Sequence, residues 1–199
     1  MSQHMEMPPD PITLFLTVRS RAERQEPWEA TACVLATADA RGRPSARFVL
    51  VKEVDADGFW FYTNEESLKG RDLAENPWAA LCFHWSSEHV QFRVEGRVEK
   101  ARAERSDAYF AGRPRISQIG AWASEQSRPL ASRDALLQRV RELETMYEGK
   151  PIPRPPHWGG YRVIPERIEH WQEGEFRLHD RHLYERQPDG SWNITRLSP

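Results

Sequence analysis

Short runs of alternating or continuous apolar residues dominate the first half of the chain and return at its C-terminal end. Such runs predict β-strands, because successive side chains of a strand point to opposite faces. Turn signals join several of them, among them Asp39 to Gly42, Asp55 to Gly58 and Pro188-Asp189-Gly190. The predicted strands cover residues 31–38, 45–54, 59–63, 79–85 and 90–100, and then 160–164, 168–172, 177–186 and 192–197.

Four other stretches carry helical spacing or helix-end signals. Pro11 suits a first helical turn, Ser67 and Ser132 are candidate N-caps, and Arg113-Pro114 interrupts a third stretch. The predicted helices cover residues 10–24, 67–75, 103–123 with that interruption, and 132–148. Because strands follow one another without a helix between each pair, the order predicts an α+β fold with an antiparallel barrel rather than a doubly wound parallel sheet.

Length and composition suit one domain, predicted for residues 11–199 behind a disordered, polar and Pro-rich lead-in at residues 1–10. A net charge of −2 argues against a nucleic-acid coat protein or a polybasic membrane binder. No apolar run is long enough to span a bilayer, and no signal peptide is recognisable, so a cytoplasmic location is expected. Cys33 and Cys82 lie in apolar runs and are expected to be reduced core thiols, with a disulfide between them as the alternative.

Several common functional motifs are missing from the sequence. It contains neither G-x-G-x-x-G nor G-x-x-x-x-G-K-[ST], and no G-x-S-x-G. His179 and His182 would lie on opposite faces of a strand and have no accompanying ligand set, so no metal is expected. A phosphorylated cofactor would therefore have to be held by side chains.

Basic residues alternate with other types between Glu175 and Arg181. As a β-strand, this segment would place Arg177, His179 and Arg181 on one face. Three such side chains repel one another unless an anion lies opposite, and the planar fork of arginine suits a phosphate. The alternative is a solvated polar edge strand.

Three further groups suit anion binding, each with a plain structural alternative. The strand from Arg47 to Lys52 has a charge at both ends, and these charges either meet a partner or reach solvent. Tyr62 and Thr63 precede a helix N-terminus with Lys69 in its first turn, which is either an anion site or an ordinary cap. The remaining candidates are Tyr109, Arg113 and Ser117, spaced by four along a helix face, and Gln91, Gln126, Ser127 and Trp171, which either contact a ring or are structural.

Five segments together resemble the pyridoxine (pyridoxamine) 5′-phosphate oxidase family, and they occur in the family's order across about residues 11–199. The resemblance implies a split antiparallel β-barrel of the FMN-binding type with flanking helices, and a homodimer with two FMN sites at the subunit interface. The segments are Arg47-Phe-Val-Leu-Val-Lys52, Phe61-Tyr-Thr-Asn64, Arg113-Pro-Arg-Ile-Ser-Gln-Ile-Gly-Ala-Trp122, Trp158-Gly-Gly-Tyr-Arg162 and Trp171-Gln-Glu-Gly-Glu-Phe-Arg-Leu-His-Asp-Arg181.

The resemblance also implies the roles of individual residues. Arg177 and His179 are the expected catalytic residues. The expected substrate contacts are Lys52, Tyr109, Arg113, Ser117, Arg177, Leu178 and His179. The expected FMN contacts are Arg47, Phe48, Val49, Leu50, Val51, Lys52, Tyr62, Thr63, Lys69, Gln91, Gln126, Ser127, Trp171 and Arg181.

The implied reaction is the oxidation of pyridoxine 5′-phosphate, pyridoxamine 5′-phosphate or both to pyridoxal 5′-phosphate. A hydride passes from the substrate C4′ to flavin N5, and dioxygen reoxidises the flavin with release of hydrogen peroxide. The chain departs from the family at Leu68, where an arginine is common. Two alternatives stay open, namely a sister flavin oxidase acting on another ring, such as a phenazine precursor, and a non-catalytic protein that binds flavin or pyridoxal phosphate.

Overall fold

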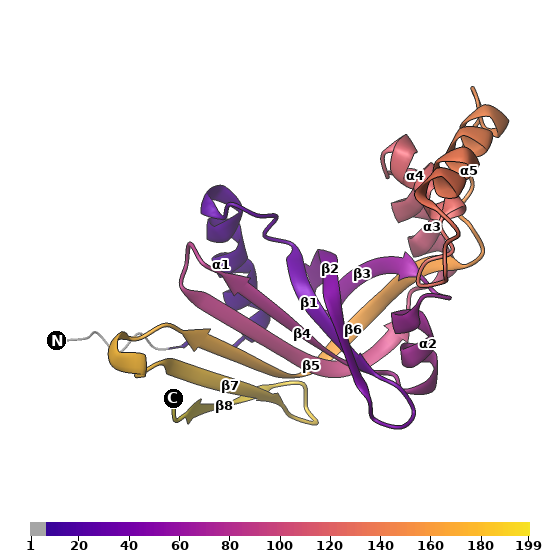
Figure 1. The fold of residues 1–199 in the computed structure, drawn as a ribbon. Coiled ribbons are helices and arrows are strands. Elements are labelled where there is room, and N and C mark those ends of the chain that lie inside the picture. Colours follow the sequence, from indigo (N-terminus) through magenta and orange to yellow (C-terminus); the bar gives the residue numbers. More distant parts are fainter. Residues whose placement is uncertain (1–6) are drawn as a thin grey trace.

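The structure of the protein is a computed structural model, which describes residues 7–199. Its centre is a closed antiparallel barrel of six strands, which confirms the predicted fold class (Figure 1). The barrel strands are β1 (Ala32–Ala38), β2 (Pro44–Asp55), β3 (Gly58–Asn64), β4 (Trp78–Trp85), β5 (Val90–Lys100) and β6 (Trp158–Gln172). Their order is β3-β2-β1-β4-β5-β6, and pairing of β6 with β3 closes the barrel. The last two strands, β7 (Asp180–Arg186) and β8 (Trp192–Leu197), extend the sheet from β6.

Aromatic side chains fill the barrel where helix α1 (Pro11–Gln25) packs against the strands. The ring of Phe15, which is fully buried, lies 4.8–5.2 Å from the rings of Phe59, Phe83, Trp85 and Phe92. Every second residue of β1 and β5 is buried, as the alternation in the sequence predicts. The helix and the inner faces of the strands therefore share one hydrophobic core.

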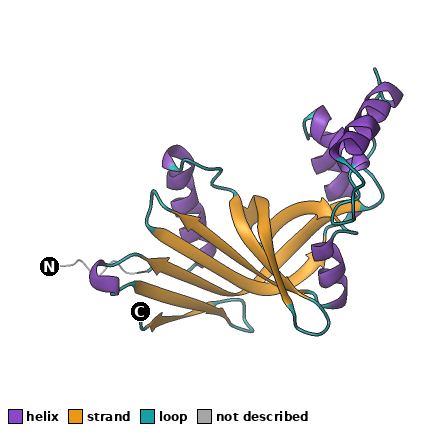
Figure 2. Cartoon of the chain, in the orientation of Figure 1, coloured by secondary structure: helices purple, strands orange, loops and turns teal. Residues whose placement is uncertain are grey.

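Of the other helices, only the one that contains Leu73 contributes a buried side chain to this core within residues 7–199. Helix α2 (Leu68–Glu75) begins after Ser67, whose hydroxyl accepts a hydrogen bond from the Gly70 amide. Helices α3 (Ala103–Ala111), α4 (Arg115–Ala123) and α5 (Arg133–Met146) cluster at one end of the barrel, far from β7 and β8 (Figure 2). The interruption between α3 and α4 falls at residues 112–114, where the sequence predicts it.

Two strand predictions are wrong in detail. Residues 160–164 and 168–172 belong to one strand. Its pairing with β5 shifts register between Glu95 and Gly96, which pair with Arg167 and Pro165, and then continues on both sides of the shift. The strand predicted for 177–186 starts only at Asp180. Residues 175–177 form a single 3-10 turn instead, with φ of 56° at Phe176 and 65° at Arg177, values that do not occur in a strand.

The structure describes the last four residues of the predicted lead-in, residues 7–10. Residues 1–6 lie outside the described residues. Beyond them, Met7 packs against the core and the Pro8 carbonyl accepts a hydrogen bond from the Tyr184 hydroxyl at 3.0 Å. Cys33 and Cys82 are both free thiols, as expected. Within residues 7–199, no helix has both the length and the apolar character needed to cross a membrane.

A buried histidine pair makes the fold sensitive to acid. His170 on β6 and His182 on β7 lie opposite each other, 8% and 7% exposed, and neither Nδ1 atom has a hydrogen-bond partner among residues 7–199. Burial lowers the pKa of His170 from 6.5 to about 4 and also lowers the pKa of His182. Each group therefore favours its neutral form in the folded protein.

We expect acidification from pH 7 to 4.5 to lower the free energy of unfolding by roughly 2 to 3 kcal/mol through His170 alone, because the unfolded chain takes up that proton first. Urea denaturation at both pH values measures the change. His170→Gln removes this component, whereas His84→Gln, at an exposed histidine, retains it. Equal pH dependence of the His170→Gln variant and the wild type would contradict the assignment.

Candidate active site

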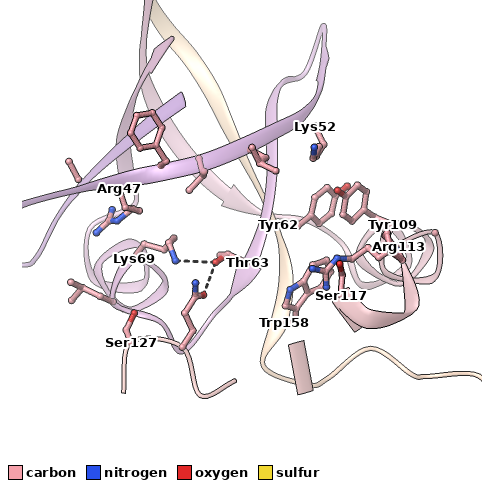
Figure 3. A pocket seen from close by; sticks show the side chains of 18 of the residues that line it. Arg47, Lys52, Tyr62, Thr63, Lys69, Tyr109, Arg113, Ser117, Ser127 and Trp158 are labelled. Carbon is pink, nitrogen blue, oxygen red and sulfur yellow. Dashed lines mark hydrogen bonds between the residues drawn. The ribbon is translucent and has the colours of Figure 1, made fainter. Parts of the chain in front are cut away.

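A cavity of about 1030 Å³ opens between the barrel and the helical end of the molecule (Figure 3). Its lining comes from strands β2 and β3, the first residue of β6, helices α2, α3 and α4, and residues 112–114 and 126–127. Thirteen predicted site residues line it, namely Arg47, Phe48, Val49, Leu50, Lys52, Tyr62, Thr63, Lys69, Tyr109, Arg113, Ser117, Gln126 and Ser127. Residues up to 113 positions apart in the sequence (45 to 158) therefore converge on one space.

One end of the cavity carries a buried lysine without a bonded carboxylate. Lys69, in the first turn of α2, is 6% exposed, and its ammonium donates to the hydroxyls of Thr63 at 3.2 Å and Ser67 at 3.1 Å. The Thr63 hydroxyl in turn donates to the Gln126 amide oxygen at 3.2 Å. Burial of a charge among neutral groups is unfavourable. An anion in the cavity would supply the missing counter-charge.

The electrostatics of this end agree with that geometry. Burial, together with the positive charge of Arg47, lowers the pKa of Lys69 from 10.5 to about 8, although Asp72 partly offsets both effects. Arg47 is fixed by hydrogen bonds to the hydroxyls of Thr37 and Ser45, each at 2.7 Å. Two basic side chains therefore lie at the end that we call the Lys69 pole, defined by Arg47, Thr63, Lys69, Gln126 and Ser127.

The opposite end holds an arginine with an unbonded, buried nitrogen. The guanidinium of Arg113 lies 4.8 Å from the centre of the Trp158 ring, and its Nη1 atom has no hydrogen-bond partner among residues 7–199. Burial lowers the pKa of Arg113. Tyr109, one turn earlier, stacks on Tyr62 with ring centres 3.7 Å apart. These residues and Ser117 form the second end, which we call the Arg113 pole (Figure 3).

Arg113 and Arg115 lie on either side of Pro114 and point in different directions relative to the cavity. The Arg115 guanidinium faces away from the cavity and donates to the carbonyls of Tyr147 and Lys150 at 2.5 and 3.0 Å. The break at Pro114 thus turns one arginine inward and the other outward. Sequence reasoning did not identify Trp158 as a site residue, although the tryptophan belongs to a segment that resembles the family.

Two residues of β2 that were expected to contact FMN, Lys52 and Val51, make other contacts in the structure. The Lys52 ammonium lines the cavity but bonds the Glu29 carboxylate, with the Thr31 hydroxyl 3.5 Å away. This contact lowers the pKa of Glu29. Val51 is fully buried in the barrel core and does not line the cavity, because alternate side chains of a strand point to opposite faces. A side-chain contact from Val51 to a ligand in the cavity is therefore excluded.

Besides Val51, six predicted site residues do not line this cavity, namely Gln91, Trp171, Arg177, Leu178, His179 and Arg181. They gather instead around β5, β6 and β7, at the far side of the barrel from α3–α5 (Figure 1). Gln91 and Trp171 are direct partners in the sheet, and the His179 ring lies 4.5 Å from the Trp171 ring.

The prediction that one strand face carries Arg177, His179 and Arg181 is wrong, because only Arg181 belongs to β7. His179 precedes the strand, and Arg177 lies in the left-handed turn. The three residues belong to the connection between β6 and β7 and to the start of β7, so a turn rather than strand alternation places them at this end of the sheet. Gly174 makes the turn possible, since a Cβ there would lie 2.1 Å from the Leu178 carbonyl oxygen.

Comparison with known proteins shows the family of the chain. Residues 21–147 match the family model described as pyridoxamine 5′-phosphate oxidase, and residues 158–199 match the pyridoxine 5′-phosphate oxidase C-terminal dimerisation region. The chain belongs to the pyridoxine/pyridoxamine 5′-phosphate oxidase family. Proteins named pyridoxine/pyridoxamine 5′-phosphate oxidase are 53% identical over 199 residues in Myxococcus xanthus (100% of this chain, 96% of the relative) and 56% identical over 191 residues in Anaeromyxobacter dehalogenans (96% of each).

Solved structures agree with the fold. The crystal structure of PhzG from Burkholderia lata 383, in complex with tetrahydrophenazine-1-carboxylic acid, superposes with a TM-score of 0.91 at 34% identity and covers 98% of this chain and 95% of PhzG. A pyridoxamine 5′-phosphate oxidase-related, FMN-binding protein from Nostoc punctiforme shares the fold at 20% identity, with a TM-score of 0.77, over 97% of this chain and all of that protein. Five of the predicted site residues outside the cavity, namely Trp171, Arg177, Leu178, His179 and Arg181, lie in the segment that matches the dimerisation region.

Proposed function

We propose that the protein is an FMN-dependent oxidase that converts pyridoxine 5′-phosphate, pyridoxamine 5′-phosphate or both to pyridoxal 5′-phosphate, with dioxygen as the acceptor and hydrogen peroxide as the second product. The observation that carries the proposal is a single cavity with a cationic pole at each end, Lys69 at one and Arg113 at the other. A phosphorylated cofactor and a phosphorylated substrate together supply two such anions.

The Lys69 pole fits the phosphate of FMN. Within residues 7–199 its buried ammonium bonds only hydroxyls. Arg47, whose guanidinium also lies 3.7 Å from the Asp72 carboxylate, adds a second positive charge. Thr63, Gln126 and Ser127 add neutral hydrogen-bonding groups beside it. When bound, FMN supplies the redox chemistry, taking up a hydride from the substrate C4′ and passing the electrons to dioxygen. The protein's own contribution is to bind, orient and exclude water.

We expect the affinity for FMN to fall as the pH rises from 7 to 9.5, by up to about tenfold per pH unit above 8, because Lys69 loses its charge near pH 8. The stability of the unliganded protein should change in the opposite sense and rise with pH. Lys69 is harder to protonate when folded, so its contribution to stability rises between pH 8 and 10.5. Fluorescence titration of the apoprotein with FMN measures the affinity. Lys69→Gln should bind weakly at every pH, and a slope equal to that of the wild type would contradict the role of Lys69.

The Arg113 pole fits the phosphate of the substrate. The buried Nη1 of Arg113 can donate to a phosphate oxygen, and the hydroxyls of Tyr109 and Ser117 line the same end. Lys52 joins them if the phosphate displaces Glu29 from its ammonium. These groups fix one end of the substrate and so orient its ring in the space between the poles.

A second copy of the chain would complete the site. Large apolar side chains are exposed at the rim of the cavity, where Phe48 is 76% exposed, and in the 175–178 segment, where Phe176 and Leu178 are 89% and 71% exposed. Together with the match to a dimerisation region, this supports a homodimer in which Arg177 and His179 of one subunit reach the cavity of the other. His179 Nδ1 accepts from the Gly174 amide at 3.3 Å, so the neutral ring presents Nε2–H as a donor.

Anaerobic addition of pyridoxine 5′-phosphate or pyridoxamine 5′-phosphate to the yellow holoprotein tests the proposal. One or both substrates should bleach the flavin absorbance, and admission of air should restore it. The reaction should release one molecule of hydrogen peroxide for each molecule of aldehyde formed. The likeness to PhzG supports a second candidate, an oxidase of a phenazine precursor. Bleaching by tetrahydrophenazine-1-carboxylic acid alone would favour that function, and a flavin that neither compound reduces would indicate a binding protein.

A further inference from the structure

A nearly inaccessible carboxylate lies among the predicted FMN contacts of the β5–β6–β7 sheet. Glu169 on β6 has a side chain that is 3% exposed. Each of its oxygens bonds a different arginine, Oε1 to Arg181 Nε at 2.8 Å and Oε2 to Arg93 Nη2 at 2.7 Å. The two arginines come from β7 and β5, the strands on either side of β6.

The sheet register places these groups on one face. Arg93 lies directly opposite Glu169, and two residues along β6, Trp171 lies between Gln91 and Arg181. Since alternate residues share a face, all five side chains project to the same side of the sheet. Three of them are expected FMN contacts, whereas Glu169 and Arg93 have no expected role at the cofactor.

The hydrogen bonds fix the orientation of Arg181 and leave one nitrogen available. Nε is held by Glu169, and Nη1 donates to the Ser198 carbonyl at 2.9 Å. Nη2 has no partner within residues 7–199. The guanidinium is planar, so fixing two of its nitrogens also fixes the direction of the third. The bond to Glu169 also raises the pKa of Arg181, which keeps the side chain cationic.

Stability alone gives little reason to keep this arrangement. Desolvation of a buried carboxylate costs about as much as its ion pairs return, and apolar replacements of such clusters are often as stable. An apolar cluster, however, cannot hold a cation in the position where it contacts a ligand. We infer that Glu169 is a positioning residue that holds Arg181 with Nη2 directed at FMN, an inference that rests on the proposed function.

A double-mutant cycle on FMN affinity tests this role. We expect Glu169→Gln and Arg181→Met each to raise the FMN dissociation constant roughly tenfold, the effect of one charge-assisted hydrogen bond. The double variant should be no weaker than Arg181→Met, because Glu169 acts through Arg181. Losses that multiply in the double variant would overturn the inference. Fluorescence titration of the apoproteins gives the constants, and circular dichroism checks the fold.

Arg93→Met is the matched control. It breaks the other half of the same carboxylate bridge but leaves the bond to Arg181, so its FMN affinity should stay within about threefold of the wild type. A loss as large as that of Glu169→Gln would mean that the bridge only joins the strands, and would overturn the inference. If Glu169→Gln does not fold, Glu169→Asp, which keeps the charge, enters the cycle with the same expectation.

The outcomes separate this inference from the proposed function. If the wild type fails to bind FMN, the proposed function fails and the positioning role fails with it. If the wild type binds FMN and Arg181→Met binds it equally well, Arg181 is no FMN contact, and only the positioning role is overturned. If the wild type binds FMN and Arg181→Met weakens binding while Glu169→Gln does not, only the positioning role is overturned.

Discussion

Two variants that are inactive on their own, Arg113→Met and Arg177→Met, should together recover about a quarter of wild-type turnover when they form mixed dimers. Arg113 lines the cavity, whereas Arg177 lies in the turn before β7, outside the cavity of its own chain. If the site is shared, each mixed dimer contains one site with both arginines and one with neither. Random association makes about half of the dimers mixed, so about a quarter of all sites are intact.

The measurement uses co-expression of the two chains with different affinity tags. Native mass spectrometry gives the fraction of mixed dimers, and the initial rate of pyridoxal 5′-phosphate formation gives the recovered activity. The matched control pairs Arg177→Met with His179→Ala, both in the connection between β6 and β7. A site then takes both groups from the same chain, so mixing should recover nothing. Inactive Arg113/Arg177 mixtures that contain mixed dimers would disprove a shared site.

The barrel could be predicted because its determinants are local. Alternating burial in β1 and β5 and the turns between strands are visible in the sequence. The left-handed turn at Phe176 and Arg177 was not predictable, because neither residue type favours positive φ. Its conformation depends on Gly174 and on packing that the local pattern does not contain.

The candidate site could also be predicted only in part. Spacing by four correctly grouped Tyr109, Arg113 and Ser117, although Pro114 breaks the helix between them. The partners that modulate the basic residues lie far away in sequence, such as Glu29 for Lys52, and no local pattern indicates such a pairing. In the proposed homodimer, Arg181 and Trp171 would contact the same ligand as Lys69 of the other subunit, and no pattern within one chain can locate that subunit.

Substitution of Arg113 by methionine should lower kcat/KM for the phosphorylated substrate by roughly 10² to 10³, with FMN affinity unchanged. The guanidinium is packed against Trp158, and its buried Nη1 has no protein partner within residues 7–199, so a substrate phosphate would be its counter-charge. Removing one member of a desolvated charge pair costs about 2 to 5 kcal/mol. Steady-state oxygen uptake gives kcat/KM, and flavin fluorescence gives the FMN dissociation constant.

Arg115→Met provides the control for charge and helix position. That guanidinium faces away from the cavity and bonds only backbone carbonyls, so kcat/KM should stay within about threefold of the wild type. A second comparison uses the dephosphorylated substrate, pyridoxine. Wild type and Arg113→Met should oxidise it equally poorly, because Arg113 then has no anion to bind. An Arg113→Met variant that loses activity equally on both substrates would show that Arg113 maintains the structure of the cavity rather than binding the phosphate.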